Sequence, residues 1–96
     1  MQTKLRVLDV SNNQIEHLTN LAGIAPELEE LWASSNKLTS FDEIEKELGD
    51  KTKLETVYLE GNPMQYASGP MYRNKVKLAL PNIRQIDAGK QQFRNT

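Results

Sequence analysis

The chain contains the same short apolar pattern three times, and this repetition limits its fold more than any other feature. The segments "LRVLDVSNNQI", "LEELWASSNKL" and "LETVYLEGNPM" share the form L-x-x-L-x-L-x-x-N-x-L, with changes only among apolar side chains. The second copy begins 23 residues after the first, and the third begins 26 residues after the second. Three five-position matches at similar intervals indicate a repeat array. The matching positions are Leu5, Leu8, Val10, Asn13 and Ile15; Leu28, Leu31, Ala33, Asn36 and Leu38; and Leu54, Val57, Leu59, Asn62 and Met64.

This repeat predicts an α/β solenoid. In each copy the central residues form a short parallel strand whose apolar side chains point inward, and the asparagine satisfies backbone groups of the following turn. One repeat cannot bury its apolar face alone, so neighbouring repeats must stack. The pattern resembles that of the leucine-rich-repeat family over about residues 4–64. The resemblance implies parallel strands on a concave face and helical or 3-10 segments on the convex face, with three repeats in residues 1–64.

The segments between the strands are predicted to be short helices. After the first strand, Leu18, Leu21 and Ile24 have the spacing of one apolar helical or 3-10 stripe. After the second strand, Ser40 and Glu43 form a capping-box signature, which marks the start of a helix. The apolar face of this second helix comprises Phe41, Ile44 and Leu48, and Gly49 follows it.

Residues 65–96 leave the pattern and are predicted to form a C-terminal helical cap within the same domain. Pro70 can open a helix and Pro81 can close it. A cap is needed because the open end of a parallel array would expose unpaired backbone groups and apolar side chains. The cap residues expected to face the body are Tyr72, Val76, Ala79, Leu80, Ile83 and Ile86.

The cap sequence also narrows the family. The string "YRNKVKLALPNIRQIDA", at positions 72–88, is similar to the C-terminal cap of one branch of leucine-rich-repeat proteins. That branch includes the regulatory subunit of protein phosphatase 1, the A-prime protein of the U2 spliceosomal particle and an axonemal dynein light chain. The pairs that carry the similarity are Tyr72-Arg73, Leu80-Pro81 and Ile86-Asp87.

The concave face is predicted to carry the only tryptophan of the chain. Side chains between the inward positions project to the opposite face, because successive side chains of a strand alternate. Stacked strands then align Asp9, Trp32 and Tyr58 in one column, with Glu30 and Glu60 beside it. Exposed aromatic rings flanked by carboxylates on a rigid sheet are typical of protein-binding hot spots. The alternative is that Trp32 only packs on neighbouring side chains of the sheet.

The chain as a whole is similar to the last repeats and cap of the leucine-rich-repeat regulatory subunits of protein phosphatase 1. The resemblance implies a non-catalytic module that binds the phosphatase catalytic subunit in the nucleus and cytoplasm, and it leaves open whether a third regulatory protein joins. In that family the concave face makes the contact, and the matching positions are Asp9, Glu30, Trp32 and Tyr58. Glu60 is added from its place on the strand. Family members carry more repeats and an N-terminal cap, so an N-terminally truncated array is expected.

Two other interpretations stay open. One is a spliceosomal scaffold of the A-prime kind, which would use the same face on a ribonucleoprotein partner. The other is a repeat fragment with no partner of its own.

The charge distribution favours a basic partner surface for the repeats. Residues 1–62 carry twelve Asp and Glu against six Lys and Arg, whereas residues 63–96 carry one against six. The overall charge of −1 gives no general attraction to nucleic acid. The cap cations lack the interleaved aromatic side chains of a nucleic-acid groove, so we interpret them as a solvated helix face rather than a phosphate-binding stripe. These cations are Arg73, Lys75, Lys77 and Arg84.

The sequence does not predict an enzyme. Without cysteine there is no disulfide, thiolate nucleophile or cysteine zinc site. His17 is the only histidine and is expected at an exposed turn or convex position, so no Ser-His arrangement is available. No cofactor or metal motif is present, and no apolar run approaches the roughly 18 residues of a membrane helix. We therefore expect no catalytic residues, no cofactor, no metal, no direct nucleic-acid contact and no membrane contact.

Overall fold

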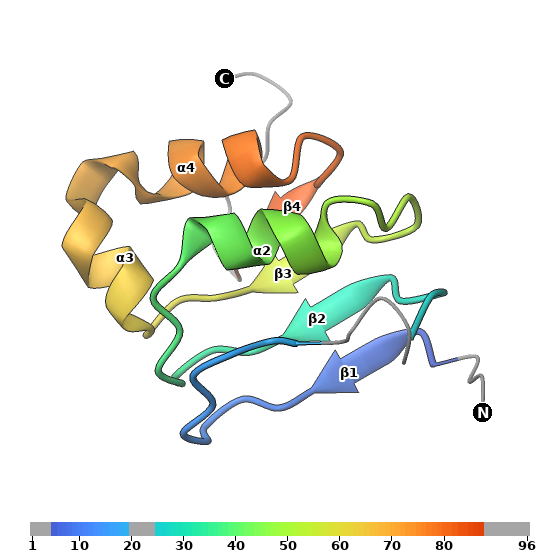
Figure 1. Cartoon of the computed structure of the whole chain (residues 1–96), viewed down its shortest axis with the longest axis horizontal. Helices are drawn as coiled ribbons and strands as arrows, with labels where there is room; N and C mark the ends of the chain where they lie inside the picture. Colours follow the sequence, from blue (N-terminus) through green and yellow to red (C-terminus); the bar gives the residue numbers. More distant parts are fainter. Residues whose placement is uncertain (1–4, 20–24, 88–96) are drawn as a thin grey trace.

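Four short parallel strands form one sheet in chain order, and helices lie on one side of it (Figure 1). The computed structural model describes residues 5–19 and 25–87. The face of the sheet away from the helices is the concave face. This arrangement confirms the predicted α/β solenoid. The strands are β1 (Val7–Asp9), β2 (Glu30–Trp32), β3 (Thr56–Tyr58) and β4 (Gln85–Ile86), and the helical segments are α2 (Phe41–Leu48), α3 (Pro63–Ser68), the 3-10 turn η1 (Gly69–Met71) and α4 (Tyr72–Ala79).

The register of the sheet follows the repeat. Leu8 pairs with Leu31, Leu31 with Val57, and Val57 with Ile86. The last three of these side chains have no exposed surface, so the inward face is the core, as the alternation of strand side chains predicts. The five pattern positions of the second and third repeats are all buried.

The first repeat is less well buried than the other two. Leu8, Val10 and Ile15 are only partly buried against the core, and Leu5 is 36% exposed. The reason is that β1 lies at the edge of the sheet and has one neighbouring strand in the described structure. Leu18 is buried in the same region, whereas Leu21 and Ile24 lie outside the described residues.

The pattern asparagines of the second and third repeats, Asn36 and Asn62, each connect their repeat to the one before it. The side-chain Nδ2 of Asn62 donates to the carbonyl oxygens of Ala33 and Leu59, at 3.0 and 2.7 Å. Its Oδ1 accepts from the backbone N–H groups of Asn36 and Leu38, at 3.1 and 3.0 Å. The fully buried amide therefore satisfies four backbone groups, three of them in the preceding repeat. Asn36 does the same one repeat earlier, with Ile15, Val10, Ala33 and Ser34.

The capping box predicted for α2 is half formed. Ser40 Oγ accepts from the N–H of Glu43 at 3.0 Å, which caps the helix as expected. The carboxylate of Glu43 instead lies 3.3 Å from Nδ1 of His17, whose side chain is 68% exposed. Ile44 and Leu48 are buried, as predicted for the apolar face of this helix.

The cap helix begins later than predicted. We expected it to open at Pro70, but α4 begins at Tyr72, because Gly69 adopts a left-handed φ of 56° and starts a separate 3-10 turn. The helix ends at Ala79, and Leu80 leaves the helical region, as a residue before proline tends to do. All six residues expected to face the body are buried. The sequence pattern did not predict α3 or β4.

Asp87 follows β4 and binds backbone groups of the third repeat. Its Oδ1 accepts from the N–H groups of Leu59 and Glu60, at 2.8 and 3.0 Å, and lies 3.2 Å from the hydroxyl of Tyr72. Burial raises the pKa of the Tyr72 phenol, and the adjacent Asp87 carboxylate raises it further. Arg73 donates to the carbonyl oxygen of Ile86 at 3.1 Å. The Tyr-Arg and Ile-Asp pairs of the cap motif are therefore hydrogen-bonding partners.

Candidate functional site: the concave face of the sheet

The structure confirms the predicted column of side chains on the concave face. Asp9 of β1 pairs with Trp32 of β2, and Trp32 pairs with Tyr58 of β3. Trp32 is 36% exposed, so the only tryptophan lies outside the core, as the alternation of side chains predicted. Tyr58 is half-buried and Asp9 is exposed.

Trp32 and Tyr58 form an aromatic pair. Their ring centroids lie 5.2 Å apart at an interplanar angle of 42°, within the range of favourable aromatic contacts. The indole N–H of Trp32 donates to Oε1 of Glu30 at 2.9 Å. Near the hydroxyl of Tyr58, the amide of Gln85 donates to the carbonyl oxygen of Asp87 at 2.9 Å and lies 3.5 Å from the phenol oxygen. The two rings therefore contact each other, and each has a polar neighbour, Glu30 beside Trp32 and Gln85 beside Tyr58.

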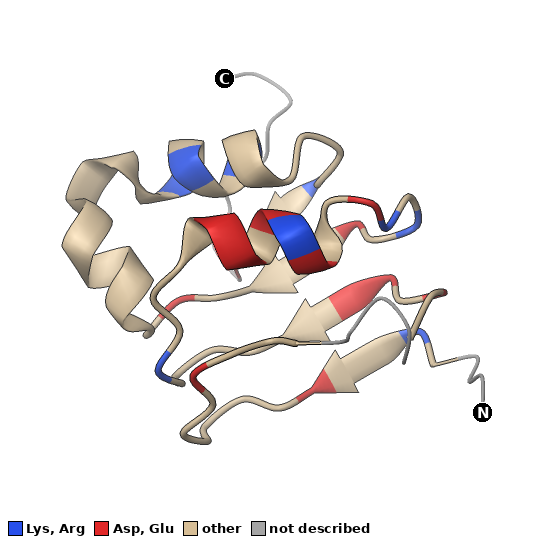
Figure 2. Ribbon diagram, in the orientation of Figure 1, with Lys and Arg blue, Asp and Glu red and all other residues tan. Residues whose placement is uncertain are grey.

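Carboxylates surround this pair. Asp9 Oδ1 accepts from the N–H of Ser11 at 3.0 Å, and Asp9 and Glu60 are both exposed. Figure 2 shows acidic residues on β1 and β2, whereas α4 carries basic residues. The concave face thus combines aromatic area with negative charge, which suits a partner surface that carries basic side chains.

The structure brings only some of the five predicted site residues into direct contact with one another. Glu30, Trp32 and Tyr58 form one contact chain, and Asp9 is joined to Trp32 by strand register. Glu60 is exposed and lies two residues beyond the end of β3, and its backbone N–H donates to Asp87. Gln85 was missed as a neighbour of Tyr58, although Ile83-x-x-Ile86 repeats the spacing of Leu54-x-x-Val57 and could have indicated β4.

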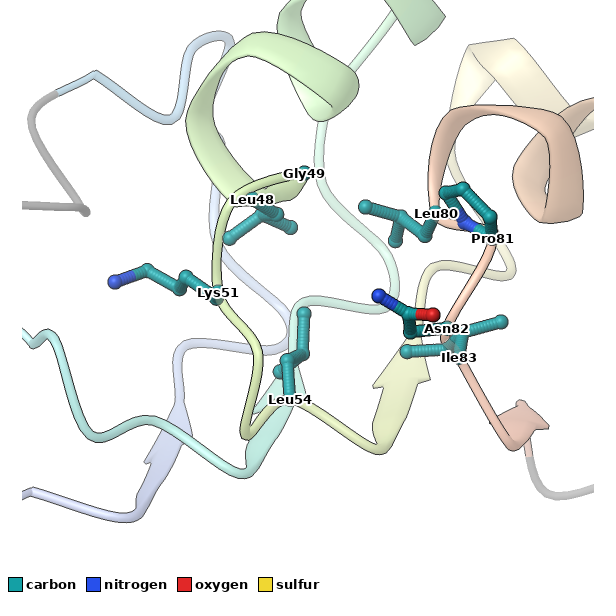
Figure 3. Close-up of a pocket in the computed structure, with 8 residues that line it drawn as sticks. All are labelled: Leu48, Gly49, Lys51, Leu54, Leu80, Pro81, Asn82 and Ile83. Carbon is teal, nitrogen blue, oxygen red and sulfur yellow. The ribbon is translucent and has the colours of Figure 1, made fainter.

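The cavity below α2 and α4 is too small for a ligand. It has a volume of about 10 Å³, room for one water molecule at most (Figure 3). Lys51 lines it, but its ammonium group points away and donates to the carbonyl oxygen of Ala25 at 2.7 Å. Burial lowers the pKa of Lys51, and Glu47 partly opposes this effect. The other lining residues are Leu48, Gly49, Leu54, Leu80, Pro81, Asn82 and Ile83.

Two basic side chains of the cap, Lys75 and Lys77, contact other groups of the folded chain. Lys77 Nζ donates to the carbonyl oxygens of Pro81 and Ile83, at 2.8 and 3.1 Å. Lys75 lies 5.8 Å from the ring centroid of Phe41, a cation–π contact. These contacts favour a structural role over a phosphate-binding stripe.

Metal and membrane sites are not found in the part of the chain that the structure describes. Residues 5–19 and 25–87 contain no group of three or more His, Cys, Asp or Glu side chains placed to hold a metal ion. Within the same residues, no helix is both long and apolar enough to cross a membrane.

Comparison with known proteins agrees with the fold. A family model described as "Leucine Rich repeats (2 copies)" matches residues 3–46. The chain has a leucine-rich-repeat fold. It is similar to the structure of the Drosophila melanogaster SNF/U2A' complex, with a TM-score of 0.76 and 30% identity over 90% of this chain and 48% of that one. It is also similar to the Mex67 leucine-rich-repeat domain of Chaetomium thermophilum, with a TM-score of 0.74 and 28% identity over 94% and 59% of the two chains.

The sequence relatives are regulatory subunits of a phosphatase. The chain is 62% identical over 71 residues to protein phosphatase 1 regulatory subunit SDS22 of Schizosaccharomyces pombe. That match covers 74% of the chain and 21% of the relative. Protein phosphatase 1 regulatory subunit 7 of Homo sapiens is 62% identical over 42 residues, which are 44% of the chain and 11% of the relative. The predicted resemblance to these non-catalytic subunits is confirmed, and the chain spans about a fifth or less of their length.

Proposed function

We propose that this chain is a protein-binding module of a phosphatase regulatory subunit, and that its concave face binds the catalytic subunit of protein phosphatase 1. The observation that carries the proposal is the contact between exposed Trp32 and half-buried Tyr58 on neighbouring strands of the sheet. The 62% identity to a phosphatase 1 regulatory subunit supports this choice of partner. On the same ground we propose a location in the nucleus and cytoplasm.

The chemistry of the face suits protein recognition. Large aromatic rings supply contact area at a small cost in side-chain entropy, and they dominate binding energy when neighbouring groups exclude water. The surrounding carboxylates would orient a basic partner surface and speed association. The residues assigned to partner binding are Asp9, Glu30, Trp32, Tyr58 and Glu60.

A calorimetric titration of the chain with the phosphatase 1 catalytic subunit tests the proposal. Trp32→Ala removes the central ring, and we expect a loss of about 2 kcal/mol or more, which is about a 30-fold rise in Kd. Tyr66→Ala is the matched control, because Tyr66 is an aromatic residue of α3 that is 71% exposed and lies away from the sheet. Its affinity should equal that of the parent. An equal affinity for Trp32→Ala would remove this ring from the interface.

A second candidate is a scaffold that binds an RNA-binding protein. The structural similarity to the SNF/U2A' complex favours it, because that complex contains SNF together with U2A'. The same titration with SNF in place of the phosphatase compares the two candidates directly. Binding of SNF but not of the catalytic subunit would replace the first proposal by the second.

A further inference from the structure

Glu30 and Trp32 are close because of strand geometry. They lie two positions apart in β2, so both side chains project to the concave face. The carboxylate of Glu30 accepts the indole N–H of Trp32 at 2.9 Å. Trp32 is thus held by Glu30 at its N–H edge and by Tyr58 across its ring.

Two contacts restrict the side chain more than one. An exposed tryptophan with no polar contact can occupy several rotamers, and its ordering must then occur when the partner binds. Here Tyr58 limits the ring from the neighbouring strand, while Glu30 selects the orientation that points the N–H along β2. The aromatic surface is therefore arranged before any partner arrives.

We propose that Glu30 is a positioning residue, whose carboxylate fixes the indole of Trp32 in the orientation that the partner recognises. This inference rests on the proposed binding function of the concave face, and it explains how the orientation of Trp32 on that face is set. Glu30 contributes through Trp32, so the loss of its hydrogen-bond acceptor matters more than the loss of its charge.

Two substitutions separate the hydrogen bond from the charge. Glu30→Gln removes the charge but keeps a carbonyl oxygen that can accept the indole N–H, whereas Glu30→Ala removes both. Glu60→Ala removes one charge from the same face without a described contact to the indole, and it is the control for the indole measurement. Far-UV circular dichroism and urea midpoints of all variants establish that they are folded.

The indole N–H gives a direct measurement, since the chain has one tryptophan and hence one indole signal in a proton–nitrogen NMR spectrum. We expect Glu30→Ala to shift this signal and to speed its exchange with water. Glu30→Gln and Glu60→Ala should leave exchange within about twofold of the parent. In titrations with the phosphatase catalytic subunit, Glu30→Ala should bind about 2- to 12-fold more weakly than Glu30→Gln, the range of one hydrogen bond.

The NMR result tests the positioning role of Glu30, and the binding result tests the proposed function of the chain. An indole signal unchanged in Glu30→Ala would overturn the positioning role, and so would an indole signal in Glu30→Gln that matches Glu30→Ala. Failure of the parent to bind the catalytic subunit would overturn the proposed function. In that case the indole measurement still decides whether Glu30 positions Trp32.

Discussion

Replacement of Asn62 by alanine should destabilise the fold more than its size suggests. The buried amide makes four hydrogen bonds to backbone groups. In Asn62→Ala the carbonyl oxygen of Ala33 keeps a second donor, Nδ2 of Asn36 at 3.1 Å. The N–H groups of Asn36 and Leu38 and the carbonyl of Leu59 have no second hydrogen bond among the described contacts. Three buried polar groups would thus be orphaned.

Each orphaned group costs about 1 kcal/mol or more, so the expected loss is at least about 3 kcal/mol. A domain of 96 residues has a total unfolding free energy of about 5 to 14 kcal/mol, which makes this loss a large share of the whole. With a urea m-value of about 1.5 kcal/mol/M, the unfolding midpoint should fall by about 2 M.

Asn13→Ala is the matched control in the first repeat. Asn13 donates to the carbonyl oxygens of Val10 and Ser11, at 2.8 and 3.1 Å, but it is exposed and water can replace it. We expect a loss below about 1 kcal/mol for this variant. Urea unfolding followed by circular dichroism measures both. A loss for Asn62→Ala no larger than that for Asn13→Ala would refute the argument that the buried amide joins two repeats.

Two further predictions concern the cap and the turns. Tyr72→Phe removes the hydrogen bond to Asp87 and should cost about 1 kcal/mol. Because the pKa of Tyr72 is raised in the folded state, the unfolded chain loses this proton first above pH 10, so stability should fall by about 1.4 kcal/mol per pH unit there. In Tyr72→Phe this contribution should be absent in urea titrations at pH 10 to 12, and an identical pH dependence would contradict it. Gly61→Ala should lower the free energy of unfolding by about 2 kcal/mol or more, because φ is +82° and a Cβ would lie 2.9 Å from Ser35 Oγ. Gly69→Ala should lower it by only about 1 kcal/mol, because φ is +56° but a Cβ there would meet open space. Thermal unfolding measures both losses, and equal losses would refute the steric contribution at Gly61.

The repeats could be predicted from the sequence because their signal is local and periodic. The inward positions, the column of Asp9, Trp32 and Tyr58, and the cap of α2 at Ser40 each follow from spacing within a few residues. The exposure of Trp32 followed from the alternation of strand side chains alone.

The cap was harder to predict because its interactions are long-range. Asp87 binds backbone groups 27 and 28 residues earlier in the chain, and no local pattern indicates these contacts. The start of α4 was wrong by two residues, since the left-handed conformation of Gly69 decides it. The hydrogen bond between Trp32 and Glu30 depends on side-chain rotamers, which spacing does not specify.

The unequal repeat intervals have a consequence for how this surface can change. Asp9 and Trp32 are 23 residues apart and Trp32 and Tyr58 are 26 apart, yet the three remain in register. The additional residues lie in the α2 segment on the far side of the sheet, so chain length can vary there without shifting the residues that face a partner. Insertions and deletions behind the sheet therefore leave the strand register unchanged. Partner specificity can then change through single substitutions on the concave face, while the backbone of the strands stays the same.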